Sequence, residues 1–465
     1  MKTMADQVGT HVKHYVADQT AAGTAVVFAA TDAFKVGKGS GVEITATPTV
    51  EALDAFRATR DPREEVQTTL EVAIAVNMDL NSSGTQGTAV DYAPLLETGF
   101  TDTAISATSV AGSPSPTTTV FTLTADNLDA GQDGAVTFAS GDYVGKTYYF
   151  HVVSKDGAAL TVYPALPKAP VALDVIEAVI NYTCPCQPSE IVTLWRMWGI
   201  CGTDQWAEYA EAAWANEFVW TFARGERANL AMSGMAHDYA RMNSTTLDQA
   251  IDDAVVEMSV DDAGNTVGAI LYGGTEQFKI SSVDSTGLDF GMSRGYGGTS
   301  AASHLDEIAL TPGGGVTTET TSGDPIRMLA GRLFLDIDTT SGDSIKADSV
   351  TITHNTGRAP LFYNGDGGKV AETNAPGDRS TILSINVYID ETNLHLFQKA
   401  QARTTLRWSF QCGDTAGRAI FFYGPKVPFN PANVPNKPGE MLTLTMESRP
   451  FMGSSTDGDS FQFAC

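Results

Sequence analysis

Short segments of alternating apolar and polar residues, each ended by glycine, proline or a small polar turn, recur along almost the whole chain. The run TTLEVAIAVNM at 68–78 is one example, and RLFLDID, SVTITHN, TLRWSFQ and MLTLTME follow in the second half. A period of two residues places one set of side chains in a core and the other on a surface, which is typical of half-buried strands. No sustained heptads or long helical periods occur. The pattern therefore predicts a mainly β protein.

A low share of charged residues accompanies this pattern. The chain has 465 residues, of which 42% are hydrophobic, so it is long enough for two or three domains with hydrophobic cores. Its 44 glycines favour short strands joined by tight turns. Only 18% of the residues are charged, below the usual quarter for soluble domains, which is compatible with a surface partly covered by partners.

The charge that is present is mostly negative. The chain has 29 basic and 55 acidic residues, giving a net charge of −26. A protein that grips nucleic acid needs lysine and arginine to displace the counterions of the phosphates. The balance therefore argues against a protein that reads DNA sequence, whereas a wall past which DNA slides is compatible with it.

The beginning of the chain and the cysteines both point to a cytoplasmic protein. The first residues lack the apolar core of a signal peptide, and the apolar stretch at 21–30 is too short to span a bilayer. Five cysteines, an odd number, fit folding in a reducing cytoplasm. Cys184 and Cys186 are separated only by Pro185, closer than the usual spacing of zinc ligands, so buried free thiols are favoured over a metal site.

The first half of the chain divides into an arm and a domain with an insertion. Residues 1–67 predict an extended N-terminal arm, and 68–245 a first domain. After the strand at 68–78, DYAPLLETGF at 91–100 has a capping aspartate, apolar residues at helical spacing and a stop glycine, which predicts a short helix on a sheet. The Ser-Pro and threonine run near 112–119 is typical of a linker, so 110–170 is interpreted as an inserted small β module.

The second half repeats parts of the first. Residues 246–325 predict a glycine-rich linking region with a hairpin around 267–282, and 326–465 a second domain. Segments 189–234 and 380–424 share the order strand, helical patch, strand, tight turn, strand, with helical patches expected at 204–217 and 391–402. The matched pairs are Trp220 with Trp408, Phe222 with Phe410, Gly225 with Gly413, Glu226 with Asp414, Arg227 with Arg418, Ala228 with Ala419, and Gly234 with Gly424. Duplication explains this order and spacing; the alternative is that any two hairpins share alternation and a turn glycine.

With this order of elements the chain resembles the tail tube, or major tail, proteins of long-tailed bacteriophages. The resemblance rests on the strand, helix and Gly-Glu hairpin at 172–240 and on the pairing of VQTTLEVAIAVNM with DYAPLLETGF, and it is weaker over 326–465. It implies a mainly β fold with two tandem tube-like β-sandwich or barrel domains, each with a short helix on the sheet, beside the inserted β module. The insertion and the long link depart from a minimal tube domain.

The resemblance also implies a function, that of a structural, non-enzymatic virion subunit in the tail of a siphovirus. Sheets would pair edge to edge into a ring with a wide lumen, and the rings would stack into a tube that conducts DNA during ejection. Two tube domains in one chain imply a homotrimer ring with pseudo-sixfold symmetry. The implied partners are further copies of the chain, the tape-measure protein, and the tail terminator and distal tail proteins. Assembly would take place in the host cytoplasm.

No catalytic, cofactor-binding or metal-binding residue is predicted. The seven histidines, at positions 11, 14, 151, 237, 304, 354 and 395, lack HExxH or paired spacing. The glycine cluster at 295–300 lacks the lysine of a phosphate-binding loop, and the NGDG run at 364–367 lacks the glutamate of a calcium loop, so an ordinary loop and a hairpin turn are favoured. The acidic pairs at 252–253 and 261–262 are interpreted either as solvated surface or as part of a negative lumen.

Two other functions remain open from the sequence. The chain is also compatible with another β-rich virion protein, such as a tail terminator, distal adaptor or capsid decoration protein, which would form a single ring without stacking. A carbohydrate-binding surface protein, with aromatic residues in a sugar groove, is disfavoured by the missing export signal.

Overall fold

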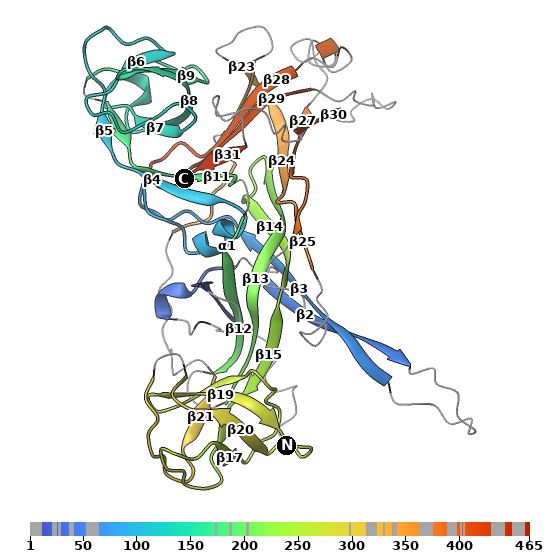
Figure 1. Cartoon of the computed structure of the whole chain (residues 1–465). Coiled ribbons are helices and arrows are strands. Elements are labelled where there is room, and N and C mark those ends of the chain that lie inside the picture. Colours follow the sequence, from blue (N-terminus) through green and yellow to red (C-terminus); the bar gives the residue numbers. More distant parts are fainter. Residues whose placement is uncertain are drawn as a thin grey trace.

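The computed structural model is built almost wholly from β-strands, as the alternating pattern predicts (Figure 1). The structure describes residues 12–20, 26, 29–36, 41–52, 65–172, 174–185, 188–200, 204–296, 299–312, 323–328, 331–336, 342–361, 375–387, 398–399, 402, 405–428, 442–448 and 461–465. Among these residues, no helix has the length and apolar character needed to cross a membrane.

One long strand, β13 (Asp204–Ala223), organises the molecule. Its first half pairs with β12 (Ile191–Ile200) and β15 (Asp238–Asn243), and its second half pairs with β14 (Asn229–Ala236) and β24 (Ala347–Asn355). The change of partners coincides with shifts of register and with a positive φ of 48° at Ala212. Bulges of this kind bend a strand, so β13 joins two regions of sheet.

The helical patch expected at 204–217 is therefore wrong, because these residues lie in β13. Alanine and glutamate favour helix locally. Here the strand is hydrogen-bonded along both edges, and Tyr209 and Trp214 are fully buried. Tertiary pairing outweighs a local preference of a few tenths of a kcal/mol per residue. Most of the second patch, at 391–402, lies outside the described residues.

The main sheet continues outward from β13 on both sides. Its strand order is β2-β3-β14-β13-β24-β27-β30, and every pairing is antiparallel. The four strands not yet introduced are β2 (Gly41–Ala52), β3 (Glu65–Asp79), β27 (Ser380–Val387) and β30 (Leu442–Ser448). Strand β3 includes the strand expected at 68–78. Strand β2, which lies in the predicted arm at 1–67, is paired along the main sheet, and the β2–β3 hairpin reaches away from the body (Figure 1).

A second sheet packs on the main sheet and completes a sandwich. Its order is β23 (Asp343–Ile345), β22 (Arg332–Leu335), β28 (Thr405–Cys412), β29 (Ile420–Pro428), β31 (Gln462–Ala464), β11 (Val179–Thr183) and β4 (Thr101–Ile105). The C-terminal strand β31 lies between β29 and β11. The expected short helix is α1 (Ala93–Glu97), whose Leu95 and Leu96 are buried in the same core.

The two segments of the internal repeat meet in this core. The rings of Phe222 on β13 and Phe410 on β28, which the repeat matches, lie 4.8 Å apart. Both predicted tube-like domains, at 68–245 and 326–465, supply residues to this single hydrophobic core. Each of the two predicted domains also contributes strands to both sheets of the sandwich. The proposed boundary between them stays a prediction.

Both segments of the expected repeat contain an antiparallel hairpin, β13–β14 and β28–β29, but their returning strands pair in different registers. Trp220 lies opposite Leu230, whereas Trp408 lies opposite Gly424. A Cβ added to Gly424 would lie 2.0 Å from the Trp408 ring, so this glycine makes room for the indole. The expected match of Gly234 with Gly424 is therefore wrong, because the longer turn of the second hairpin shifts the register.

The inserted module forms a six-stranded sheet with a core of its own. The order is β5 (Thr108–Ser109), β10 (Val175–Glu177), β7 (Asp133–Thr137), β8 (Thr147–Asp156), β9 (Ala159–Tyr163) and β6 (Val120–Thr122). Its core includes Phe421 and Tyr423 of β29, which attaches the module to the second sheet of the sandwich.

The region expected as a glycine-rich link is a second six-stranded unit, which we call the distal module. Its order is β16 (Thr245–Thr246), β21 (Ala309–Thr311), β18 (Ile270–Gly273), β19 (Glu276–Val283), β20 (Asp289–Ser293) and β17 (Glu257–Ser259). The expected hairpin at 267–282 corresponds to β18–β19. The module's core includes Trp195 and Tyr209, and β1 (Lys13–Gln19) pairs with β12 beside it. Figure 1 shows the distal module at the end of the long β12, β13 and β15 strands.

Candidate assembly surface

The outward face of the main sheet is polar and built from small side chains. Along each strand, buried apolar residues alternate with exposed or half-exposed ones, as in a sheet with one solvated side. The outward residues are Glu43, Thr45, Thr47, Glu71, Ala73, Ala75, Asn77, Asn229, Ala231, Ser233, Glu217, Val219, Thr221, Ala223, Ser349, Thr351, Thr353, Asn355, Ile382, Ser384 and Asn386. None of them is lysine or arginine. We call this set the polar face.

The strand register makes the polar face continuous. One row runs from Glu43 through Ala75, Ser233 and Glu217 to Asn355, each residue lying opposite the next on the neighbouring strand. Cross-strand neighbours of this kind lie about 5 Å apart. The result is a surface of mostly small, uncharged or acidic side chains across six strands. None of the residues of the polar face is a cation that would hold a phosphate.

The ends of this sheet are open strand edges. Among the described strands, β2 pairs only with β3 and β30 pairs only with β27. An open edge presents unpaired backbone N–H and C=O groups and so pairs readily with another strand. Two open edges on one sheet let copies of the chain join side by side.

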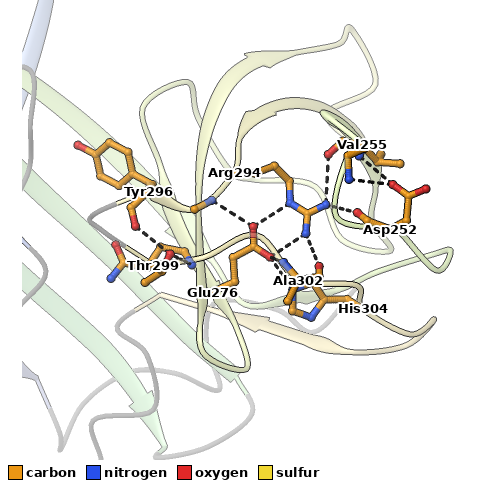
Figure 2. A network of polar contacts seen from close by, with 11 residues as sticks. Asp252, Val255, Glu276, Arg294, Tyr296, Thr299, Ala302 and His304 are labelled. Carbon is orange, nitrogen blue, oxygen red and sulfur yellow. Dashed lines mark hydrogen bonds and ion pairs between the residues drawn. The ribbon is translucent and has the colours of Figure 1, made fainter.

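A buried carboxylate with several hydrogen-bond donors around it, that of Glu276, lies inside the distal module. Glu276 is fully buried, and its carboxylate accepts hydrogen bonds from Arg294 Nε at 2.8 Å and Nη2 at 2.7 Å, and lies 2.8 Å from His304 Nε2 (Figure 2). The backbone N–H groups of Gly295 and Ala302 donate at 3.1 and 2.9 Å. Burial by itself raises the pKa of Glu276, but these hydrogen bonds outweigh it and lower the pKa to about 2.

This carboxylate also explains the glycine cluster at 295–300. The amide of Gly295, the first residue of the cluster, and the amide of Ala302, just beyond the cluster, donate to Glu276. Arg294 donates to the Asp252, Val255 and Ala302 carbonyl groups (Figure 2). The Glu276 carboxylate thus accepts hydrogen bonds from the Gly295 and Ala302 amides, which are therefore not available to a phosphate.

A second buried cluster joins the inserted module to the C-terminal strand. Asp133 Oδ1 lies 2.8 Å from His151 Nδ1 and accepts a hydrogen bond of 2.6 Å from Gln462 Nε2. Asn181 donates to the Asp133 carbonyl group, and the His151 ring stacks on Tyr423 at 3.6 Å. Burial raises the pKa of Asp133 despite the hydrogen bonds from His151 and Gln462.

Among the remaining sequence candidates, Cys184 and His354 lie side by side. Cys184 is a free thiol whose pKa burial raises to about 12, and its Sγ donates to the Phe461 carbonyl group at 3.2 Å. It lies 3.7 Å from Nε2 of His354, a ring whose pKa is lowered to about 3 by burial and by Arg379. In the described part of the chain, no three His, Cys, Asp or Glu side chains gather as metal ligands would.

The other sequence candidates lie at separate places in the fold. The acidic pairs at 252–253 and 261–262 are exposed on the distal module, away from the polar face. His14, like His354, is buried, and His237 is half-buried. Cys186, His11, His395 and the NGDG run at 364–367 lie outside the described residues. The sequence did not single out Glu276, Arg294, Asp133 or Gln462, because their partners are distant along the chain.

A comparison with known protein families gives a match. A family model described as "Phage tail tube protein" matches residues 11–303, more than half of the chain. The match spans β12, β13 and β14, the inserted module and most of the distal module, and ends before the predicted second domain at 326–465. No curated protein matches the chain.

Proposed function

This chain belongs to the phage tail tube protein family, and on that premise we propose that it forms stacked rings whose lumen conducts DNA during ejection. It is a structural protein of the virion tail that self-assembles into a tube. The polar face is the observation that supports a DNA-conducting lumen. A wall without lysine or arginine offers the phosphates no counterion-releasing contact, so DNA passes without being held.

The two open edges, β2 and β30, support the proposed ring. Joining β30 of one copy to β2 of the next would continue the antiparallel sheet and remove both exposed edges. Because both predicted domains contribute strands to the main sheet, with β24 of the second paired to β13 of the first, three copies would give a ring with pseudo-sixfold symmetry. This is the homotrimer implied by the repeat.

The same proposal extends to the wider tail. We place the protein in a siphovirus tail assembled in the host cytoplasm, with the tape-measure protein inside the tube and the terminator and distal tail proteins at its ends. The family relationship supports this setting, and the predicted division into two domains supports the trimer.

Electron microscopy of the purified full-length protein tests the proposal. We expect stacked rings, with threefold symmetry and a sixfold-like outline after averaging. Single rings that never stack would favour a terminator, distal adaptor or decoration protein. A monomer that persists at all salt concentrations would contradict the proposed function.

A charge substitution on the polar face tests the lumen. Glu217→Lys adds a cation to every copy at the centre of the polar face, and we expect tubes of this variant to retain DNA at low salt and release it as salt rises. The matched control is Asp142→Lys, the same change at an exposed position of the inserted module. Equal DNA retention by both variants would show that the polar face does not line the lumen.

A further inference from the structure

A pocket of about 450 Å³ lies where the turns of the two matched hairpins approach a third segment. Its lining includes Arg227 after β13, Arg418 between β28 and β29, and Arg327 from the segment at 323–328. An isolated bridge pairs the Arg227 and Arg327 backbones. Three separate stretches of sequence thus bring arginines together in a chain whose net charge is −26.

The arginines of this pocket are not equally neutralised. Arg227 forms an ion pair with Asp79 at 2.6 Å, and Arg418 forms one with Asp324 at 3.0 Å. Both Arg418 and Asp324 are more than half exposed, so their pairing is screened by water. Arg327 is exposed and forms no ion pair or side-chain hydrogen bond with any residue that the structure describes. The pocket therefore has a guanidinium group available for an outside carboxylate.

An acidic turn lies at the opposite end of β13. Leu305 is 80% exposed, the most exposed of the large hydrophobic side chains in the described structure, and Asp306 and Glu307 follow it. Glu307 has a φ of 62°, a left-handed conformation that is costly for a residue other than glycine. The Glu307 N–H donates to the Leu247 carbonyl group at 2.9 Å, which places the turn near the strands that begin the distal module.

The two features stand at opposite ends of one strand. The Ser244 N–H donates to the Gln205 carbonyl group at the beginning of β13, whereas Arg227 follows the end of β13 at Ala223 by four residues. A straight strand of twenty residues would span about 65 Å at 3.3 Å per residue, and the bend near Ala212 shortens the distance between the two ends of β13. The pocket is lined by three arginines and by Asp324 and Asp414, and Asp414 is itself paired with Lys146 at 3.1 Å. An arginine-rich pocket at one end and an acidic turn at the other form a head-to-tail pair, which is the kind of contact that builds an open stack.

We propose that the arginine pocket receives the Leu305-Asp306-Glu307 turn of a second copy of this chain in the adjacent ring. This inference rests on the proposed function, since it needs stacked rings. Charge complementarity favours a carboxylate-bearing turn, and bidentate arginine–carboxylate pairing would fix the register between rings. Leu305 would be removed from water on contact, adding an apolar anchor.

Charge exchange in the full-length protein tests the contact. Arg327→Glu, and separately Asp306→Lys combined with Glu307→Lys, place like charges opposite each other. Each should raise the protein concentration needed for tubes on the order of tenfold while leaving ring formation intact. A variant carrying both sets of changes restores opposite charges and should recover tube length, as measured by electron microscopy and sedimentation.

Matched controls separate this contact from a general charge effect. Arg224→Glu changes an exposed arginine of the same turn that does not line the pocket, and Asp142→Lys changes an acid of the inserted module. Both should form tubes as the unchanged protein does. Normal tubes from Arg327→Glu would overturn the pocket's role while leaving the proposed tube intact. So would a combined variant, with all three substitutions, whose tube length does not recover. DNA oligonucleotide binding that depends on Arg327 would overturn it in favour of a phosphate site. Absence of rings from the unchanged protein would instead overturn the proposed function.

Discussion

The inserted module and the distal module have similar size and strand number but hold their buried carboxylates in different ways. In the distal module, Glu276 has an arginine, a histidine and two backbone amides around it. In the inserted module, Asp133 has His151 and Gln462, and its Oδ2 has no hydrogen-bond partner among the described residues. One carboxylate is neutralised by a fixed cation and the other is not.

The pKa values follow from this difference. The pKa of Glu276 is lowered to about 2, so the group stays ionised and paired at all pH values at which the protein is handled. The pKa of Asp133 is raised by burial. The comparison teaches that a buried acid stabilises a module over the whole pH range only where the fold supplies its countercharge.

Glu276→Gln should have the largest effect. It leaves the Arg294 guanidinium, only 6% exposed, buried without its countercharge. We expect the free energy of local unfolding of the distal module to fall by about 3–5 kcal/mol. Hydrogen exchange measured in the full-length protein should show faster exchange at the Gly295 and Ala302 amides, with the inserted module unchanged as the internal control. Unchanged exchange would contradict the comparison.

The sequence predicts the class of fold better than the position of its elements. Period-two segments place most strands, because one face of each strand meets a core. The stretch at 204–217 fails, since its alanines and glutamates favour helix locally and only the pairing of β13 with β12 and β15 decides for strand. For the distal module the sequence predicts a glycine-rich link with one hairpin, because its short strands share a core with Trp195 and Tyr209, which are distant in the sequence.

The functional features depend on contacts between distant residues. The polar face could be anticipated strand by strand, but its continuity depends on the register between β13 and β24, whose paired residues are more than 120 positions apart in the sequence. Arg227, Arg327 and Arg418 are scattered in the sequence and meet only in the folded chain. Glu276 is not part of a sequence motif. The glycine cluster at 295–300, which begins with one of its amide donors, is the sequence feature that points to this region.

Gln462→Ala should have an intermediate effect. The change removes a donor 2.6 Å from Asp133 Oδ1 in a site without access to water, and it leaves that carboxylate with fewer partners. We expect local stability at the contact between β31 and the inserted module to fall by about 1–3 kcal/mol. Hydrogen exchange at the amides of β31 and β7 reports the change, and the distal module should not respond. A loss confined to the distal module would show that the two clusters are not independent.

Asp133→Asn should have the smallest effect and gives the comparison its pH test. An asparagine oxygen can still accept the hydrogen bonds from His151 and Gln462, while the cost of burying an ionised group is removed, so we expect a change within about 1 kcal/mol. The pKa of Asp133 is raised in the folded protein, so its contribution to stability is full below its unfolded pKa near 3.8 and is lost as the pH rises through its folded pKa. The variant should therefore gain stability relative to the unchanged protein as the pH rises from 4 to 8, measured by denaturant unfolding of the inserted module. A variant that loses several kcal/mol at pH 8 would show that Asp133 is ionised and stabilising, and that the two modules hold their acids in the same way.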